Sequence, residues 1–224
     1  MTGVQTCALP IYNSKLLHQW THVFRYTSGD EVFLFSPETP GTDFLYRISS
    51  ISKQAITLVP VSSAPNILPS RDMTLVMALV KKDTFETIVR QATELGVSRI
   101  IPVTASRSEK KNLNFERLHS IATEAAEQSG RGTVPEITDI LTFEEAMTKT
   151  EGEANIVGSL QGKPFETVEN GKVICLWVGP EGGWAEEEEK EFRNKGFTMM
   201  KLTETVLKAD TAAVSLLTAL ISNY

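Results

Sequence analysis

A glycine-rich loop near the end of the chain has the residue types of a ligand-binding turn. It reads Gly-Pro-Glu-Gly-Gly at residues 179–183 and directly follows the most apolar predicted strand, 172–178. Glycine adopts positive φ without strain and lets a ligand approach the backbone closely, so we expect the loop to bind a small molecule. The pattern is neither G-x-G-x-x-G nor G-x-x-x-x-G-K-[ST], so neither a dinucleotide nor a nucleoside triphosphate is indicated.

Two further segments carry more functional groups than local structure requires. Residues 203–210 precede the predicted last helix and include Lys208 and Asp210. Asp210 is either the N-cap of that helix or a substrate contact, and the sequence leaves both open. Residues 124–131, Glu-Ala-Ala-Glu-Gln-Ser-Gly-Arg, end another predicted helix, and Arg131 is a candidate contact for a phosphate or a partner.

The elements that must position these loops alternate between strand and helix from residue 73 onward. Residues 73–80 are a near-continuous apolar run, typical of a strand covered on both faces. The next helix is predicted from Asp83, an expected N-cap with Glu86 three residues later, to Gly96. Such alternation predicts an α/β fold with a parallel sheet, whose ligands bind beyond the carboxyl ends of the strands. The other predicted strands are 97–103, 154–157, 172–178 and 197–202, and the other predicted helices are 114–129, a short one capped by Thr142 and Glu145, 185–196 and 211–222.

The first part of the chain has a different, all-β pattern. Short runs rich in β-branched and aromatic residues at 32–35, 44–48 and 55–59 predict a small β-barrel. Residues 1–12 have no secretory-signal pattern and do not continue into the runs that follow, so we interpret them as part of a non-native leader. The predicted organisation is a leader at 1–15, a barrel at 16–66 whose first strand is missing, and an α/β domain at 70–224.

The composition is that of an ordinary soluble globular protein. The chain has 224 residues, of which 41% are hydrophobic, and no apolar run approaches the roughly 18 residues that span a bilayer. Cys7 and Cys175 are far apart, so we expect neither a disulfide framework nor a zinc site, and we expect a reducing compartment. Cys175 lies in an apolar run and is predicted to be a buried small hydrophobe. The three histidines lack metal-ligand spacing, so no metal is expected.

The charge is unevenly distributed. The net charge of −6 argues against tight binding of free nucleic acid, but the excess acid lies in the last third, largely at 186–189 and Glu191. We expect this acidic run to be a solvated helix face. A modest basic zone in the middle of the chain offers candidate phosphate contacts, namely Arg107, Lys110, Lys111, Arg117 and Arg131.

Four ordered motifs resemble those of the ribosomal RNA uridine-N3 methyltransferases of the RsmE family, within the SPOUT superfamily. They are ATELGVSRIIPV at 92–103, EAAEQSGR at 124–131, VGPEGGW at 178–184 and VLKADTAA at 206–213. The resemblance covers nearly everything after residue 16. It implies a PUA-like β-barrel followed by a SPOUT-type α/β domain with a C-terminal deep trefoil knot, in a homodimer whose two subunits build the site.

The resemblance also implies the roles of individual residues. S-adenosyl-L-methionine would be held by Ser159, Leu160, Val178, Gly179, Pro180, Gly182, Gly183, Leu202, Val206, Leu207, Ala209, Thr211 and Ala212. Lys208 or Arg131 would supply a catalytic cation, and Asp210 or Glu181 the general base, with Asp210 ranked first. The expected RNA contacts are Arg25, Arg107, Lys110, Lys111, Gln128 and Arg131.

The implied reaction transfers a methyl group to N3 of a uridine in small-subunit (16S) ribosomal RNA. N3 takes part in base pairing, so the target must be unpaired or flipped. The expected partner is an assembled or partly assembled small ribosomal subunit in the cytoplasm. Two rivals stay open: another SPOUT RNA methyltransferase acting on a ribose 2′-OH or a different base, and an RNA-binding homologue that has lost catalysis. Thr203, Glu204 and Lys208, which depart from the usual family motif, keep the second rival open.

Overall fold

The chain divides into two units, residues 1–67 and 68–224, and each has its own apolar core. The division falls where the all-β pattern of the sequence gives way to the alternating pattern. The computed structural model describes residues 8–36, 39, 41–66, 71–109, 112–164 and 173–221. Lys110 and Lys111, two of the expected RNA contacts, therefore lie outside the described residues.

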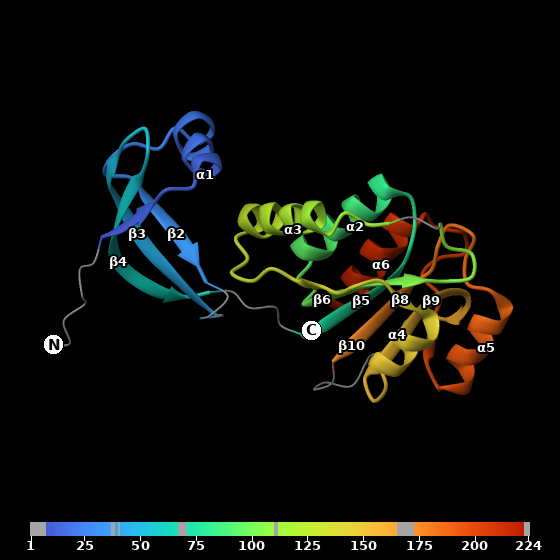
Figure 1. Cartoon of the computed structure of the whole chain (residues 1–224). Helices are drawn as coiled ribbons and strands as arrows, with labels where there is room; N and C mark the ends of the chain where they lie inside the picture. The colour runs from blue at the N-terminus through green and yellow to red at the C-terminus, as the bar shows by residue number, and fades with distance from the viewer. Residues whose placement is uncertain are drawn as a thin grey trace. The chain divides into compact units, whose positions relative to one another are not determined.

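The second unit is built on a parallel sheet (Figure 1). Its strands are β5 (Met73–Ala78), β6 (Arg99–Thr104), β7 (Glu136–Ile137), β8 (Leu141–Thr142), β9 (Ala154–Lys163), β10 (Ile174–Val178) and β11 (Thr198–Met200). Within the described residues the order is β11-β9-β10-β5-β6-β7, with β8 also beside β6, and all these pairs are parallel. Every residue of β5 and β10 is buried, because helices cover both faces of these central strands. The predicted α/β fold with a parallel sheet is confirmed.

Helices form a layer on each face of this sheet (Figure 1). Helices α2 (Lys82–Glu94), α3 (Phe115–Ser129) and α6 (Ala209–Ile221) share one apolar core with the sheet. Helices α4 (Phe143–Lys149) and α5 (Glu186–Asn194) share the other, which is rich in aromatic side chains. No helix in the described parts of the chain is long and apolar enough to cross a membrane.

Capping patterns located some helix ends and misplaced one. The box predicted at Thr142 and Glu145 is present: the Glu145 N–H donates to Thr142 Oγ1 at 3.2 Å, and the Thr142 N–H donates to Glu145 Oε2 at 2.8 Å. Gly96 follows α2 with a φ of 86°, as expected at a helix carboxyl end. The N-cap prediction for Asp83 is wrong, because the N-cap is Lys81, two residues earlier, and α2 begins at Lys82. Asp83 instead lies in the first turn, where its charge complements the helix dipole.

The first unit is an antiparallel sheet with two short helical segments. Its elements are β1 (Leu9–Ile11), α1 (Ser14–His18), η1 (Gln19–Val23), β2 (Glu31–Phe35), β3 (Thr42–Ile51) and β4 (Ile56–Pro65). The four strands described in this unit have the order β1-β4-β3-β2, and the three strands predicted from the sequence are confirmed as β2, β3 and β4. A small core that includes Trp20, Ile48 and Leu58 holds the sheet and the helical segments together.

The strand β1 lies within the segment that the sequence interpretation set aside as a leader. Leu9 pairs with Leu58 and Ile11 with Ile56, so residues 9–11 form an edge strand beside β4. The exclusion of these residues from the fold is therefore corrected. The physical reason is that the edge of β4 carries unpaired backbone N–H and C=O groups, which a short extended segment can satisfy.

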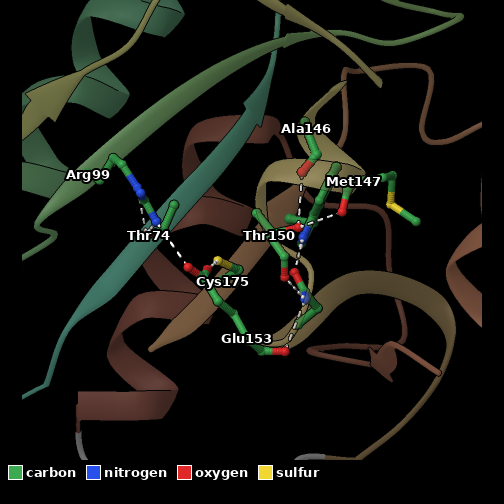
Figure 2. A network of polar contacts seen from close by, with 9 residues as sticks. Thr74, Arg99, Ala146, Met147, Thr150, Glu153 and Cys175 are labelled. Atoms are coloured by element: carbon green, nitrogen blue, oxygen red, sulfur yellow. Dashed lines mark hydrogen bonds and ion pairs between the residues drawn. The ribbon is translucent and has the colours of Figure 1, made fainter. Parts of the chain in front are cut away.

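A polar network occupies the amino-terminal edge of the parallel sheet, away from the strand ends expected to bind ligand (Figure 2). Arg99 Nη2 donates to Thr74 Oγ1 at 3.1 Å and to Glu153 Oε1 at 3.2 Å, and the Cys175 thiol contacts the same carboxylate. Burial first, and then the Glu153 carboxylate, raise the pKa of the Cys175 thiol above its ordinary range. Cys175 is thus buried, as predicted, and the network joins β5, β6, β9 and β10.

Candidate functional site

A cavity of about 450 Å³ lies at the carboxyl-terminal ends of β9, β10 and β11. This volume is within the usual range for a small-molecule site. The cavity is lined by residues 158–161, 178–184, Glu186, Glu189, Leu202, Thr203, 205–207, Ala209, Ala212, Leu216 and Arg107. Segments more than 90 residues apart in the chain therefore meet there. They meet beyond the carboxyl ends of the strands, where ligands bind in parallel α/β sheets.

Almost all the residues that the sequence assigned to a donor pocket line this cavity. The exception is Thr211, which is exposed on α6 and donates its backbone N–H to Asp210 Oδ1 at 2.8 Å. Sequence reasoning missed the remaining lining residues, which are Gly158, Gln161, Trp184, Glu186, Glu189, Thr203, Thr205, Leu216 and, as a cavity residue, Arg107. Trp184 had a signal as the last letter of the VGPEGGW motif, and Thr203 and Thr205 lie in the segment 203–210 that the sequence singled out. The others depend on how distant segments fold together.

The glycine loop is a tight turn packed on aromatic side chains. A Cβ added at Gly179 would stand 3.2 Å from Cε2 and Nε1 of Trp184, so no larger residue fits there without movement. Trp184 is itself only 6% exposed and packs against Phe143, Trp177 and Phe192. Gly183 has a φ of 69°, a conformation that strains other residues, and its N–H closes the turn onto the Pro180 carbonyl at 2.8 Å. The turn and the Trp184 ring beneath it thus shape this wall of the cavity.

The candidate catalytic residues of this region differ in position. Glu181 is exposed and lines the cavity. Lys208 is exposed and lies outside the lining; its carbonyl accepts the Ala212 N–H at 2.8 Å. Asp210 also lies outside the lining and is inside the first turn of α6, which begins at Ala209. The N-cap alternative for Asp210 is therefore excluded.

Arg131 is buried, connects α2 to the segment after α3 through hydrogen bonds, and does not line the cavity. Its side chain is 8% exposed; Nη1 donates to the Thr93 carbonyl at 2.8 Å, and Nε donates to Thr133 Oγ1 at 2.9 Å. Burial lowers the pKa of Arg131 to about 10. These contacts join the end of α2 to the segment after α3. Of the other expected RNA contacts, Gln128 is exposed on α3, and Arg25 is exposed in the first unit with a φ of 56°.

Replacing Arg131 by alanine is expected to lower the free energy of unfolding by about 1–3 kcal/mol, because the buried Thr93 carbonyl then loses its charged donor and is left with the Gly96 N–H at 3.1 Å. Urea unfolding followed by circular dichroism measures the change. Gln128→Ala, an exposed substitution near the end of the same helix, is the matched control and should leave stability nearly unchanged. Unchanged stability of Arg131→Ala together with weaker RNA binding would show that Arg131 is mainly an RNA contact.

The acidic start of α5 is not the solvated face that the sequence predicted. Glu188 is 5% exposed, and both of its carboxylate oxygens accept backbone N–H groups. Glu189 lines the cavity; it accepts the Ser159 hydroxyl at 3.3 Å and pairs with Arg193 Nη2 at 2.8 Å. The prediction is corrected for these two residues, because Glu188 contacts the loop after β6 and Glu189 contacts Ser159 of β9. Glu186 and Glu187 are exposed, as expected.

Acidic side chains outnumber basic ones in the cavity wall. Among the described residues the lining includes the carboxylates of Glu181, Glu186 and Glu189 and the guanidinium of Arg107. The cavity therefore favours a ligand with positive charge. No group of three or more His, Cys, Asp or Glu side chains in the described residues is arranged to hold a metal ion.

Comparisons with known proteins agree with this geometry. Residues 67–221 match the family described as RNA methyltransferase domain. The ribosomal RNA small subunit methyltransferase E of Aquifex aeolicus is 31% identical over 188 residues, covering 81% of this chain and 82% of that protein. Its namesake from Synechocystis is 31% identical over 206 residues, covering 88% of this chain and 67% of that protein.

A solved structure shares the fold of the whole chain. The ribosomal RNA small subunit methyltransferase E of Neisseria gonorrhoeae, bound to S-adenosyl methionine, matches with a TM-score of 0.88 and 23% sequence identity. The match covers 98% of this chain and 93% of that chain. At this identity the likeness establishes the fold.

Proposed function

Because this chain belongs to the RNA methyltransferase domain family, and within it to the ribosomal RNA small subunit methyltransferases E, we propose that it methylates small-subunit (16S) ribosomal RNA with S-adenosylmethionine as the donor. The observation that carries this proposal is the cavity of about 450 Å³. It unites the glycine loop and the segment before α6, whose motifs resemble those of the RsmE family, with the β9 end, which the resemblance assigns to the same pocket by position.

The cavity suits S-adenosylmethionine in polarity and charge. Leu160, Leu202 and Leu207 offer apolar surface for a flat ring, and the glycine loop lets the ligand approach backbone polar groups. Glu181 and Glu186 lie in the same wall and attract positively charged groups, whereas Glu189 is already paired with Arg193. When bound, the donor supplies an electrophilic methyl group on its sulfonium.

The proposed acceptor is N3 of an unpaired uridine. N3 carries a proton at neutral pH, and Glu181, which lines the cavity, accepts that proton as general base. Lys208, between two lining residues in the chain, stabilises the negative charge that develops on the uracil ring. The loops hold N3 in line with the methyl carbon, and this positioning is the larger part of catalysis.

Several finer features belong to the same proposal. Residues 16–66 together with β1 act as a PUA-like RNA-binding barrel that carries Arg25, and residues 70–224 form a SPOUT-type domain with a C-terminal deep trefoil knot. The antiparallel sheet of the first unit supports the barrel, and the place of β11 beyond β9 supports the knot. The working form is a homodimer, supported by the exposed apolar side chains of Leu160 and Val206 at the cavity.

The proposed partner is an assembled or partly assembled small ribosomal subunit in the cytoplasm. The net charge of −6 supports a partner that offers more than phosphate attraction, because an acidic protein gains little from free RNA. RNA binding through Arg25 and the other exposed Lys and Arg side chains should weaken as the salt concentration rises.

Two measurements test the proposal. Calorimetric titration with S-adenosylmethionine should give saturable heat, and its absence at about 1 mM donor contradicts the enzyme assignment. Nucleoside analysis of ribosomal RNA from cells lacking the gene should show loss of 3-methyluridine from the small subunit. Loss of a 2′-O-methyl nucleoside instead identifies a different RNA methyltransferase, and RNA binding without donor binding identifies a homologue without catalysis.

A further inference from the structure

Two side chains tie the glycine loop to the loop that follows β6. Glu188 extends one oxygen, Oε2, to the Ala185 N–H at 2.7 Å, and the other, Oε1, to the Ser106 N–H at 2.8 Å. The carboxylate is 5% exposed, so these charge-assisted hydrogen bonds are shielded from water. One side chain thereby fixes the end of the glycine loop to a segment 82 residues away in sequence.

The second side chain makes the reverse connection. Arg107, the neighbour of Ser106, donates from Nη1 to the Gly182 carbonyl at 2.9 Å and to the Trp184 carbonyl at 3.2 Å. Its stem lies along the loop, since a Cβ added at Gly182 would stand 3.4 Å from Cβ and Cδ of Arg107. The carboxylate of Glu188 and the guanidinium of Arg107 therefore hold residues 182–185 from two directions.

We propose that Glu188 and Arg107 are positioning residues that keep residues 179–185 in the shape that binds the methyl donor; this inference rests on the proposed function. Three glycines in this loop permit many backbone conformations. If only a fraction of molecules hold the binding shape, the apparent dissociation constant rises by the inverse of that fraction. The hydrogen bonds of Glu188 and Arg107 keep a high fraction of molecules in the donor-binding conformation.

This role differs from the RNA contact that the sequence assigned to Arg107. An RNA contact affects the KM for RNA and the salt dependence of RNA binding. A positioning residue for the donor loop affects the dissociation constant of the donor in the absence of RNA. The two roles thus separate in a measurement that contains no RNA.

The test measures donor affinity of the full-length protein by calorimetric titration with S-adenosylmethionine alone. Glu188→Gln keeps one acceptor oxygen and places an NH₂ group against a backbone N–H, so we expect about a tenfold rise in the dissociation constant. Arg107→Ala should give a rise of similar size, and Arg107→Lys a smaller one, because an ammonium group replaces the planar fork. The KM for the donor should rise by a similar factor, because both substitutions act on donor binding.

Glu187→Gln is the matched control, because Glu187 is the exposed neighbour on the same helix and loses the same charge. The inference is overturned if the wild type binds donor and Glu188→Gln and Arg107→Ala bind it as tightly as Glu187→Gln does. It is also overturned if Arg107→Ala changes only the KM for RNA. If Glu188→Gln fails to fold, the two variants of the exposed Arg107 still decide the question. A wild type that binds no donor refutes the proposed function instead.

Discussion

Glu181→Gln is expected to lower kcat for uridine methylation by about 100- to 10,000-fold, the range for loss of a general base. Glutamine keeps the shape of the side chain but does not take up a proton at neutral pH. Glu181 lines the cavity, whereas Asp210, the other carboxylate proposed as base, lies outside the lining. Binding of the donor should change little, because the substitution alters neither the glycines nor the contacts of Glu188 and Arg107.

Single-turnover methylation of small subunits that lack the modification, with radiolabelled donor, measures this effect. Asp210→Asn is the paired variant, since it makes the same carboxylate-to-amide change on α6. We expect a much smaller loss there. If Asp210→Asn abolishes methylation and Glu181→Gln does not, the base is Asp210, as the sequence ranking had it. If neither variant loses activity, the uridine proton leaves without a protein base.

Gly179→Val is expected to weaken donor binding by about 100-fold, which corresponds to about 2.7 kcal/mol. Even a single added carbon at this position would stand 3.2 Å from the Trp184 ring. That ring cannot retreat, because it is buried against Phe143, Trp177 and Phe192. The backbone of residues 179–183 must then shift, and the cavity wall moves with it.

Calorimetric titration with S-adenosylmethionine gives the affinity, and the thermal unfolding midpoint shows whether the fold is kept. Gly182→Ala is the control in the same loop, because its added carbon would meet the flexible Arg107 side chain at an ordinary contact distance of 3.4 Å. We expect that variant to bind donor nearly as the wild type does. Wild-type affinity in a folded Gly179→Val protein would mean that the wall formed by Gly179 and Trp184 does not contact the donor.

The sequence by itself determined the elements and the main walls of the site. The near-continuous apolar runs at 73–80 and 172–178 indicated central strands, because strands covered on both faces need few polar positions. The Thr142–Glu145 pair located a helix start, because a capping box is a contact between residues close in the chain. The glycine loop was recognised for the same reason, since its backbone requirements are local.

The tertiary structure decided which charged side chains are buried and what they hold. An acidic run that looked like a solvated helix face contains Glu188, which is buried because the β6 loop lies against it. Arg131 and Arg107 were equal candidates for phosphate contacts in the sequence. In the structure Arg131 is buried and donates to the Thr93 carbonyl, whereas Arg107 donates to the Gly182 carbonyl of the glycine loop. The burial of a charged side chain depends on which segments, distant in the sequence, pack against it. The spacing of residues within one helix or strand does not show which segments these are.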